Sequence, residues 1–371
     1  MNAVIWLKYG AQLAYGEPMG GLEQASFNIA RLLKEQVNVT LIGRGRGVKE
    51  VCENICFHGI KSTNELDYIQ KSLEVMPDAD ILHCMSNMYY LFCPKTIRKT
   101  ILHLHTEMMP LLWSSLGKPP SARYSLEEAD FIGSQLEDIR RLTSGGKSGA
   151  DAVIACSRFL SGIWRDSHTN EHVSVIYNFV DLEGFESPVY PREDFILFVG
   201  ALVPEKGVDT LCEAAAILKR QGVSTPIKVV GSPGIWGRSS DQGFPGSDSI
   251  EFTGSRKNTE VLELMKKASV GVIPSTFNDP SPIVAYEFQA CGTPVVASNV
   301  GGIPEIIQDE KTGVLVPPKN PGALAKEIKR LLTNPKLREE MGRRGRRRLE
   351  ENFTAELIKP KYLRLYKHLL T

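Results

Sequence analysis

The stretch VGVIPSTFNDPSPIVAYEFQACGTPVVAS (270–298) decides the predicted fold. Two short apolar runs, VGVIPS (270–275) and PVVAS (294–298), enclose a longer segment that is typical of a helix. Pro282 suits the first helical position and Ser281 suits the cap before it. A strand, a helix and a second strand, all short and mostly apolar, predict a parallel βαβ unit whose sheet is covered on both faces.

Two carboxylates flank the start of this predicted helix. We expect Asp279 in the loop before the first turn and Glu287 on the second turn. Between them, the first N–H groups of the helix have no partner within the helix, and they favour an anion, especially a phosphate. An anion site between two carboxylates is not needed to stabilise the fold. The stretch therefore predicts a binding site.

The same alternation of short apolar strands and helices continues through most of the chain. Helices are expected at 22–36, 209–221, 259–268 and 322–332. Strands are expected at 3–7, 39–43, 80–84, 100–105, 152–156, 173–178, 195–200, 227–231, 249–254, 270–275, 294–298 and 312–316. The pattern predicts an α/β protein with two Rossmann-like, doubly wound parallel-sheet domains that face one another across a central cleft.

A polar, proline-containing stretch at 183–194 is the best candidate for a linker between the two domains. The expected division is therefore an N-terminal domain at 1–182 and a C-terminal domain at 195–352. The final segment, 353–371, is expected to pack back onto the N-terminal domain. In such sheets ligands bind at the carboxyl ends of the strands.

Composition excludes several classes of protein. The net charge of +1 gives no global field toward nucleic acid or acidic membranes, and the basic cluster RRGRRR (343–348) is expected to be a solvated helix face. No apolar run reaches the length of a membrane span, and the seven cysteines are scattered. We expect reduced thiols, a cytoplasmic protein and no zinc site.

Three further stretches give the pattern a specific resemblance. EFQACGTPVVASNVGGIPEII (287–307), VGALVPEKG (199–207) and VIYNFVDLEGF (175–185) resemble the donor-binding region of family 4 glycosyltransferases. These are retaining sugar transferases of the GT-B fold. The resemblance covers the whole second half of the chain and extends more loosely over the first half.

The resemblance implies transfer of a hexosyl group from a UDP- or GDP-type sugar to an acceptor hydroxyl, without metal or cofactor. It implies that Glu287 binds the ribose hydroxyls, that Asp279 touches the donor sugar, and that Lys206 lies beside the distal phosphate. The residues implied in donor binding are Gly20, Gly21, Lys206, Arg256, Pro282, Ile283, Val284 and Glu287. Those implied in catalysis are Asp279, His105 and Lys206.

Two departures from the family pattern concern the donor site. Asp279 stands where family members usually have Glu, so its carboxylate is about 1.5 Å short of the usual reach. Ala201 stands where they have an Arg that pairs with the diphosphate, which removes a charge-assisted contact of about 1.5–3 kcal/mol. Arg256 is a candidate replacement for that cation.

The first half contributes weaker signals. Gly20 and Gly21 at a predicted helix entry allow close approach of a ligand to the backbone. His105, in LHLHTEMM (102–109), matches the family's histidine that contacts the donor sugar, whereas His103 is expected in the core. No third ligand follows the two histidines at zinc spacing, so no metal site is expected.

Acceptor and membrane partners stay open at this level. A glycan, a glycolipid or a small molecule could accept the sugar. The apolar and basic segment 108–124 either dips into a membrane surface, as a lipid-linked acceptor would require, or forms a buried loop anchored by Trp113. The alternatives to transfer are a GT-B epimerase or phosphorylase and a nucleotide-sugar-binding protein with weak or no activity. A dehydrogenase is disfavoured because no GxGxxG follows the first strand.

Overall fold

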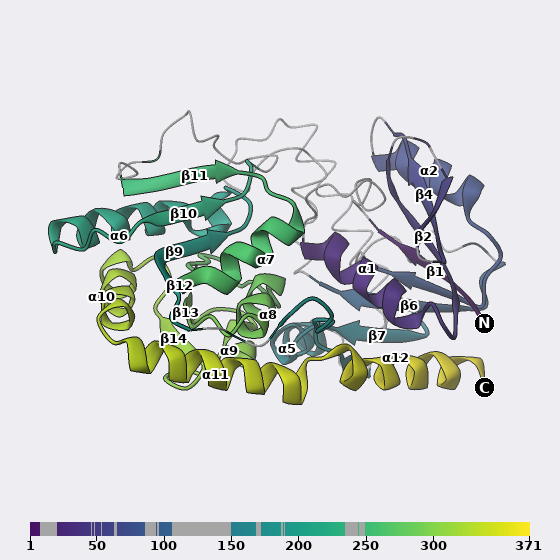
Figure 1. Cartoon of the computed structure of the whole chain (residues 1–371). Coiled ribbons are helices and arrows are strands. Elements are labelled where there is room, and N and C mark those ends of the chain that lie inside the picture. The colour runs from purple at the N-terminus through teal and green to yellow at the C-terminus, as the bar shows by residue number, and fades with distance from the viewer. Residues whose placement is uncertain are drawn as a thin grey trace. The chain divides into compact units, whose positions relative to one another are not determined.

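The computed structural model describes two compact units of the chain (Figure 1). The first comprises Met1–Tyr177 together with Ile358–Thr371, and the second comprises Asn178–Leu357. The described residues are 1–7, 21–45, 47, 49–52, 54–62, 65–85, 94, 96–105, 150–167, 172–186, 188, 190–233, 244 and 249–371. Gly20 and the segment 108–124 lie outside them.

The first unit is built on a sheet whose described strands run in the order β3-β4-β2-β1-β5-β6-β7-β8. These strands are β1 (Asn2–Trp6), β2 (Asn38–Arg44), β3 (Lys49–Cys52), β4 (Ile55–Ile60), β5 (Ile81–Cys84), β6 (Lys99–Leu104), β7 (Ala152–Ala155) and β8 (Val173–Val175). All neighbouring pairs are parallel except β3 with β4. The strand prediction missed β3 and β4, because polar residues interrupt the apolar pattern of both.

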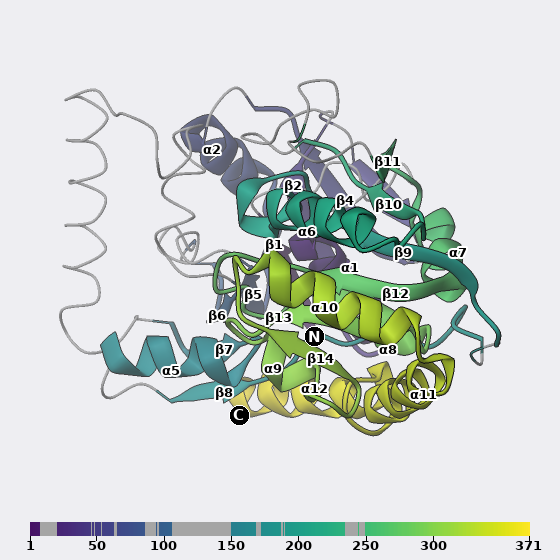
Figure 2. The same cartoon turned by 90° about the vertical axis from the view of Figure 1, so that its left-hand side faces the viewer.

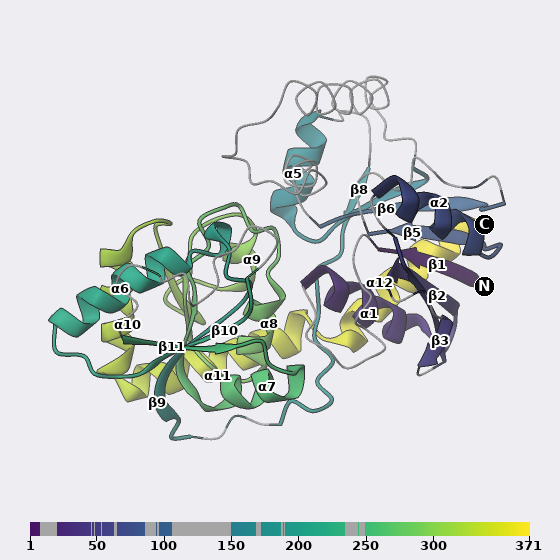
Figure 3. The same cartoon turned by 90° about the horizontal axis from the view of Figure 1, so that it is seen from above.

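Helices cover both faces of this sheet, as a mostly parallel sheet requires. They are α1 (Gly21–Leu33), α2 (Glu65–Val75), α5 (Arg158–Ser167) and the larger part of α12 (Ala355–Leu370). Figure 3 shows α2 on one side of the sheet and α1 and α12 on the other. Val4, Trp6 and Leu82 form a buried cluster with Tyr68 of α2, whereas His83 contacts Tyr366 of α12.

Two histidines and a tyrosine form a buried hydrogen-bonded chain in the first unit. His83 Nδ1 lies 2.8 Å from Tyr366 Oη, and His83 Nε2 lies 3.0 Å from His103 Nδ1. Both histidine side chains are fully buried, as expected for core residues. The chain ties the C-terminal segment to strands β5 and β6.

The second unit has a wholly parallel sheet in the order β11-β10-β9-β12-β13-β14. Its strands are β9 (Glu193–Val199), β10 (Ile227–Val230), β11 (Ile250–Gly254), β12 (Ala268–Ile273), β13 (Val295–Ser298) and β14 (Gly313–Val316). The chain moves outward from β9 to β11 and then returns to place β12 beside β9. The strand order therefore reverses between β9 and β12, which is where ligands bind in open α/β sheets.

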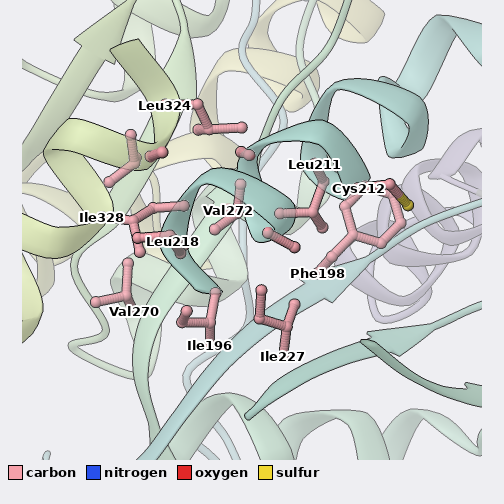
Figure 4. Close-up of a cluster of buried hydrophobic side chains, with 14 of the residues drawn as sticks. Ile196, Phe198, Leu211, Cys212, Leu218, Ile227, Val270, Val272, Leu324 and Ile328 are labelled. Carbon is pink, nitrogen blue, oxygen red and sulfur yellow. The ribbon is translucent and has the colours of Figure 1, made fainter. Parts of the chain in front are cut away.

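Helices again lie on both faces of the sheet. They are α6 (Val208–Arg220), α7 (Asn258–Lys267), α8 (Ile283–Ala290), α9 (Ile303–Ile306), α10 (Pro321–Leu332) and α11 (Pro335–Asn352). Figure 2 shows α6 and α10 lying in front of the sheet. Their apolar sides pack on strand residues such as Ile196, Val270 and Val272, with Leu211 and Ile328 from the helices, to form the core in Figure 4.

The stretch 183–194 is attached to the second unit. The boundary between the units falls after Tyr177, and β9 already begins at Glu193. Arg192 donates to the Thr293 hydroxyl at 2.9 Å and to the backbone carbonyls of Lys266 and Cys291. This half-buried guanidinium with several acceptors holds the last residues before β9 against the second unit.

We expect the buried histidines to make stability depend on pH. Burial lowers the pKa of His83 from 6.5 to about 3, so the unfolded chain binds the extra proton between these values and stability falls as pH falls through that window. Between pH 7 and pH 5, His83→Gln should therefore lose about 2 kcal/mol less stability than the wild type. Urea denaturation at both pH values measures this. His368→Gln, at an exposed position of α12, serves as control, and equal pH dependence in wild type and His83→Gln would contradict the expectation.

Candidate active site

The loops that follow β9 and β12 are held tightly together. After β9 the chain forms a short 3-10 turn, Pro204–Lys206, which ends at Gly207 with φ 74°. A Cβ at Gly207 would lie 1.8 Å from the Pro274 carbonyl oxygen, so only glycine fits this approach. The Thr276 N–H donates to the Glu205 carbonyl at 2.8 Å. Lys206 is thereby fixed beside the loop that leaves β12.

Lys206 and Asp279 form an ion pair where the strand order reverses, between the loops that follow β9 and β12. Lys206 Nζ lies 2.6 Å from Asp279 Oδ2, and it also lies 5.1 Å from the centroid of the Phe277 ring. The Asp279 side chain is 7% exposed and that of Lys206 is 33% exposed. The cation thus keeps one side open to solvent while its partner is buried.

Backbone contacts hold Asp279 from the other side. Its carbonyl accepts the Gly302 N–H at 2.9 Å. Gly301 has φ 56°, and a Cβ there would lie 2.3 Å from the Asp279 carbonyl oxygen. Gly301 is therefore needed for a close approach of two backbones, as Gly207 is.

Helix α8 begins without a side-chain cap. Pro282 occupies the N-cap position, and the helix starts at Ile283. The prediction of Pro282 as first helical residue and Ser281 as cap was wrong, because the Ser281 hydroxyl instead hydrogen-bonds Tyr286 Oη at 2.8 Å. Pro282 supplies no side-chain hydrogen bond to the first turn, so Ile283 and Val284 begin a helix whose N-terminal N–H groups suit an anion.

Glu287 lies on the second turn of α8 and is half-buried. Burial raises the pKa of its carboxyl to about 7. Within the described residues its carboxylate has no hydrogen-bond or ion-pair partner. Such a carboxylate is suited to accept hydrogen bonds from ligand hydroxyls.

Arginine side chains bind the carboxyl end of α8. Arg346 on α11 donates to the Ala290 carbonyl at 2.6 Å, and Arg192 donates to that of Cys291. Arg348 donates to the Glu305 and Ile306 carbonyls at 2.7 and 2.9 Å. The cluster 343–348 was predicted to be a solvated face. This is wrong for Arg346 and Arg348, because the acceptors they meet come from distant loops that sequence periodicity does not reveal.

The other predicted site residues lie elsewhere. Arg256 is exposed after β11, and β10 separates that strand from β9. Gly21 begins α1 and His105 follows β6, both in the first unit. The His105 ring centroid lies 4.0 Å from that of His103, and burial lowers the pKa of His105 to about 3, so it is neutral. The structure therefore brings together Lys206, Asp279 and the residues of α8, and Gly20 lies outside the described residues.

In the described part of the chain, no group of three or more His, Cys, Asp or Glu side chains could hold a metal ion. None of the described helices has both the length and the apolarity that a membrane crossing needs.

Several known proteins to which this chain is similar are glycosyltransferases. Residues 181–348 match the family model described as Glycosyl transferases group 1. The chain is 33% identical over 202 residues to an uncharacterized glycosyltransferase of Methanocaldococcus jannaschii, which is 54% of each protein. It is 30% identical over 220 residues to a D-inositol 3-phosphate glycosyltransferase of Jonesia denitrificans, which is 53% of this chain and 51% of the relative. The chain thus spans about half the length of these curated relatives.

Solved structures are similar over the whole chain. Sucrose-phosphate synthase from Thermosynechococcus elongatus has a TM-score of 0.76 at 20% identity, covering 100% of this chain and 99% of that one. HepE of Anabaena, in complex with UDP-glucose, has a TM-score of 0.73 at 17% identity, covering 99% and 100%. The fold is that of the GT-B glycosyltransferases, as predicted.

We expect Asp279→Asn to bind inorganic pyrophosphate more tightly than the wild type. The substitution frees Lys206 from its carboxylate, and an ion pair of this exposure contributes up to about 1 kcal/mol, which corresponds to a gain of up to about fivefold in affinity. Isothermal titration calorimetry measures the change.

Glu310→Gln is the matched control, because it breaks the 2.7 Å pair with Arg330 elsewhere in the second unit. It should leave pyrophosphate affinity unchanged. Weaker binding in Asp279→Asn would show that the carboxylate does not compete for Lys206.

Proposed function

We propose that this protein is a retaining hexosyltransferase that moves a sugar from a nucleoside diphosphate to an acceptor hydroxyl. The observation that supports it most is the Lys206–Asp279 pair beside the uncapped start of α8. A cation and a helix start together suit a diphosphate. Carboxylates on either side, Asp279 and Glu287, suit the hydroxylated groups that flank that diphosphate in a nucleotide sugar.

Each residue has a separate part in this proposal. Glu287 accepts hydrogen bonds from the ribose hydroxyls, and Asp279 accepts them from the donor sugar. The amides at Ile283 and Val284, presented by Pro282 at the N-cap, hold the distal phosphate together with Lys206. Gly20, Gly21 and His105 stay proposed contributors to the donor site, and Arg256 stays a proposed substitute for the cation that is missing at Ala201.

Bond making and breaking need no metal and no cofactor in this proposal. The bond between the anomeric carbon and the diphosphate oxygen breaks while the acceptor oxygen attacks from the same face. The departing phosphate oxygen takes the acceptor's proton. Lys206 and the start of α8 stabilise the negative charge that develops on the diphosphate, and this stabilisation together with orientation lowers the barrier.

The names of similar proteins support the donor and acceptor classes of this proposal. HepE was solved with UDP-glucose, which supports a donor that carries UDP. A donor that carries GDP is the alternative. The relative from Jonesia denitrificans is a D-inositol 3-phosphate glycosyltransferase, which supports a polyol or glycan acceptor. A lipid-linked acceptor, with peripheral membrane contact through 108–124 in a cytoplasmic protein, stays part of the proposal.

One observation favours a second function, a nucleotide-sugar-binding protein without turnover. Ala201 is exposed just after β9, at the position where the family has the arginine that pairs with the diphosphate. Arg256 is separated from β9 by one strand. Loss of one charge-assisted contact of about 1.5–3 kcal/mol weakens transition-state stabilisation more than it affects folding.

The test is a calorimetric panel of UDP, GDP and ADP and their glucose or mannose conjugates, followed by a radiolabel transfer assay. We expect one base to bind, with release of nucleoside diphosphate when glycan, polyol or lipid acceptors are added. Binding without any release, restored to turnover by Ala201→Arg, would establish the second function. Absence of binding by every member would contradict both.

Donor affinity should rise with pH if Glu287 acts through its carboxylate. With a pKa of about 7, the carboxyl is mostly protonated at pH 6 and mostly ionised at pH 8. We expect the conjugate that binds to do so up to about tenfold more tightly at pH 8 than at pH 6. Glu287→Gln should bind weakly at both values. A wild-type affinity independent of pH in calorimetry would contradict this role.

A further inference from the structure

The two segments by which the chain passes between its units lie side by side in the second unit. The chain enters that unit at Asn178 and leaves it after Leu357. The Val180 N–H donates to the Phe353 carbonyl at 3.0 Å, and the Ala355 N–H donates to the Val180 carbonyl at 3.2 Å. A parallel bridge, Val180 with Thr354, thus joins the incoming and outgoing segments.

Both segments also contact the start of α8. From the incoming segment, Asn178 Nδ2 donates to the Ser281 carbonyl at 3.0 Å. From the outgoing segment, the Phe353 ring meets the Tyr286 ring edge-on with centroids 5.1 Å apart. The Tyr286 hydroxyl in turn hydrogen-bonds the Ser281 hydroxyl at 2.8 Å. Ser281 is therefore held at its carbonyl and at its side chain.

Water has little access to these bonds. Asn178 and Ser281 are each 8% exposed, and Tyr286 is fully buried. A hydrogen bond to a buried carbonyl has no solvent substitute, so its loss leaves the carbonyl without a partner. Ser281 lies between Asp279 and Ile283, so a shift of its carbonyl would move the carboxylate and the first N–H groups of α8 together.

We propose that Asn178 is a positioning residue for diphosphate binding, a role that rests on the proposed function. Its amide fixes the peptide between Asp279 and the start of α8. It does not touch the ligand. Its effect on affinity comes from holding the Lys206–Asp279 pair and the N–H groups of α8 in one arrangement before a ligand arrives.

The test compares Asn178→Ala with Gln289→Ala. Gln289 Nε2 donates to the buried Ile306 carbonyl at 3.0 Å from the last turn of the same helix, so its variant loses a bond of the same kind at the opposite end. In hydrogen–deuterium exchange of the ligand-free proteins, amides of 279–285 should exchange about tenfold faster in Asn178→Ala only. Asn178→Asp, which keeps the shape without the Nδ2 donor, replaces the alanine variant if that variant does not fold.

Calorimetry with UDP, GDP and ADP is the second measurement. The diphosphate that the wild type binds should bind about tenfold more weakly to Asn178→Ala and within about twofold of wild type to Gln289→Ala. Provided that the wild type binds a diphosphate, three results would overturn the positioning role. They are exchange at 279–285 in Asn178→Ala at the wild-type rate, an affinity of Asn178→Ala equal to that of the wild type, and equal weakening of binding in both variants. A wild type that binds none of the three overturns the proposed function, and this role with it, whatever the exchange shows.

Discussion

The reversal of strand order between β9 and β12 is the constraint on which the site depends. It makes neighbours of two loops that are far apart in sequence, and it aims both at the same edge of the sheet. Gly207 then allows the loops to touch, since any larger residue would collide with the Pro274 carbonyl. The short ion pair between Lys206 and Asp279 follows from this contact, and it places a partly solvent-accessible cation beside the start of α8.

Helix α8 has opposite surroundings at its two ends. At its start the N-cap residue Pro282 has no side chain that could compete for the N–H groups, which suits an anion there. At its other end, the guanidinium groups of Arg192 and Arg346 donate to the last carbonyls. These positive charges interact favourably with the negative end of the helix dipole. Between them, burial raises the pKa of Glu287, which has no cationic partner among the described residues. The carboxyl end of α8 is therefore held by side-chain hydrogen bonds, whereas its start is the end where a ligand is expected.

Much of this could be predicted from local patterns. The strands of the second unit, the loop position of Lys206 and the placement of Asp279 and Glu287 about one helix start all follow from short runs of apolar, glycine and proline residues. What failed depended on side-chain contacts that the apolar pattern does not reveal. Ser281 has the composition of a cap, yet its hydroxyl meets Tyr286, and Arg346 and Arg348 look like surface charges until α11 lies on α8 and α9.

The sequence by itself determined that the chain forms two units with mostly parallel sheets and that the start of a helix stands between two carboxylates, because strand length, helix period and turn residues are local properties. Only the tertiary structure decided that Asp279 pairs with Lys206, that Asn178 holds Ser281, and that His83 links β5 to the C-terminal helix. These contacts join residues dozens to hundreds of positions apart, and their geometry exists only after the sheets have set the order of the strands.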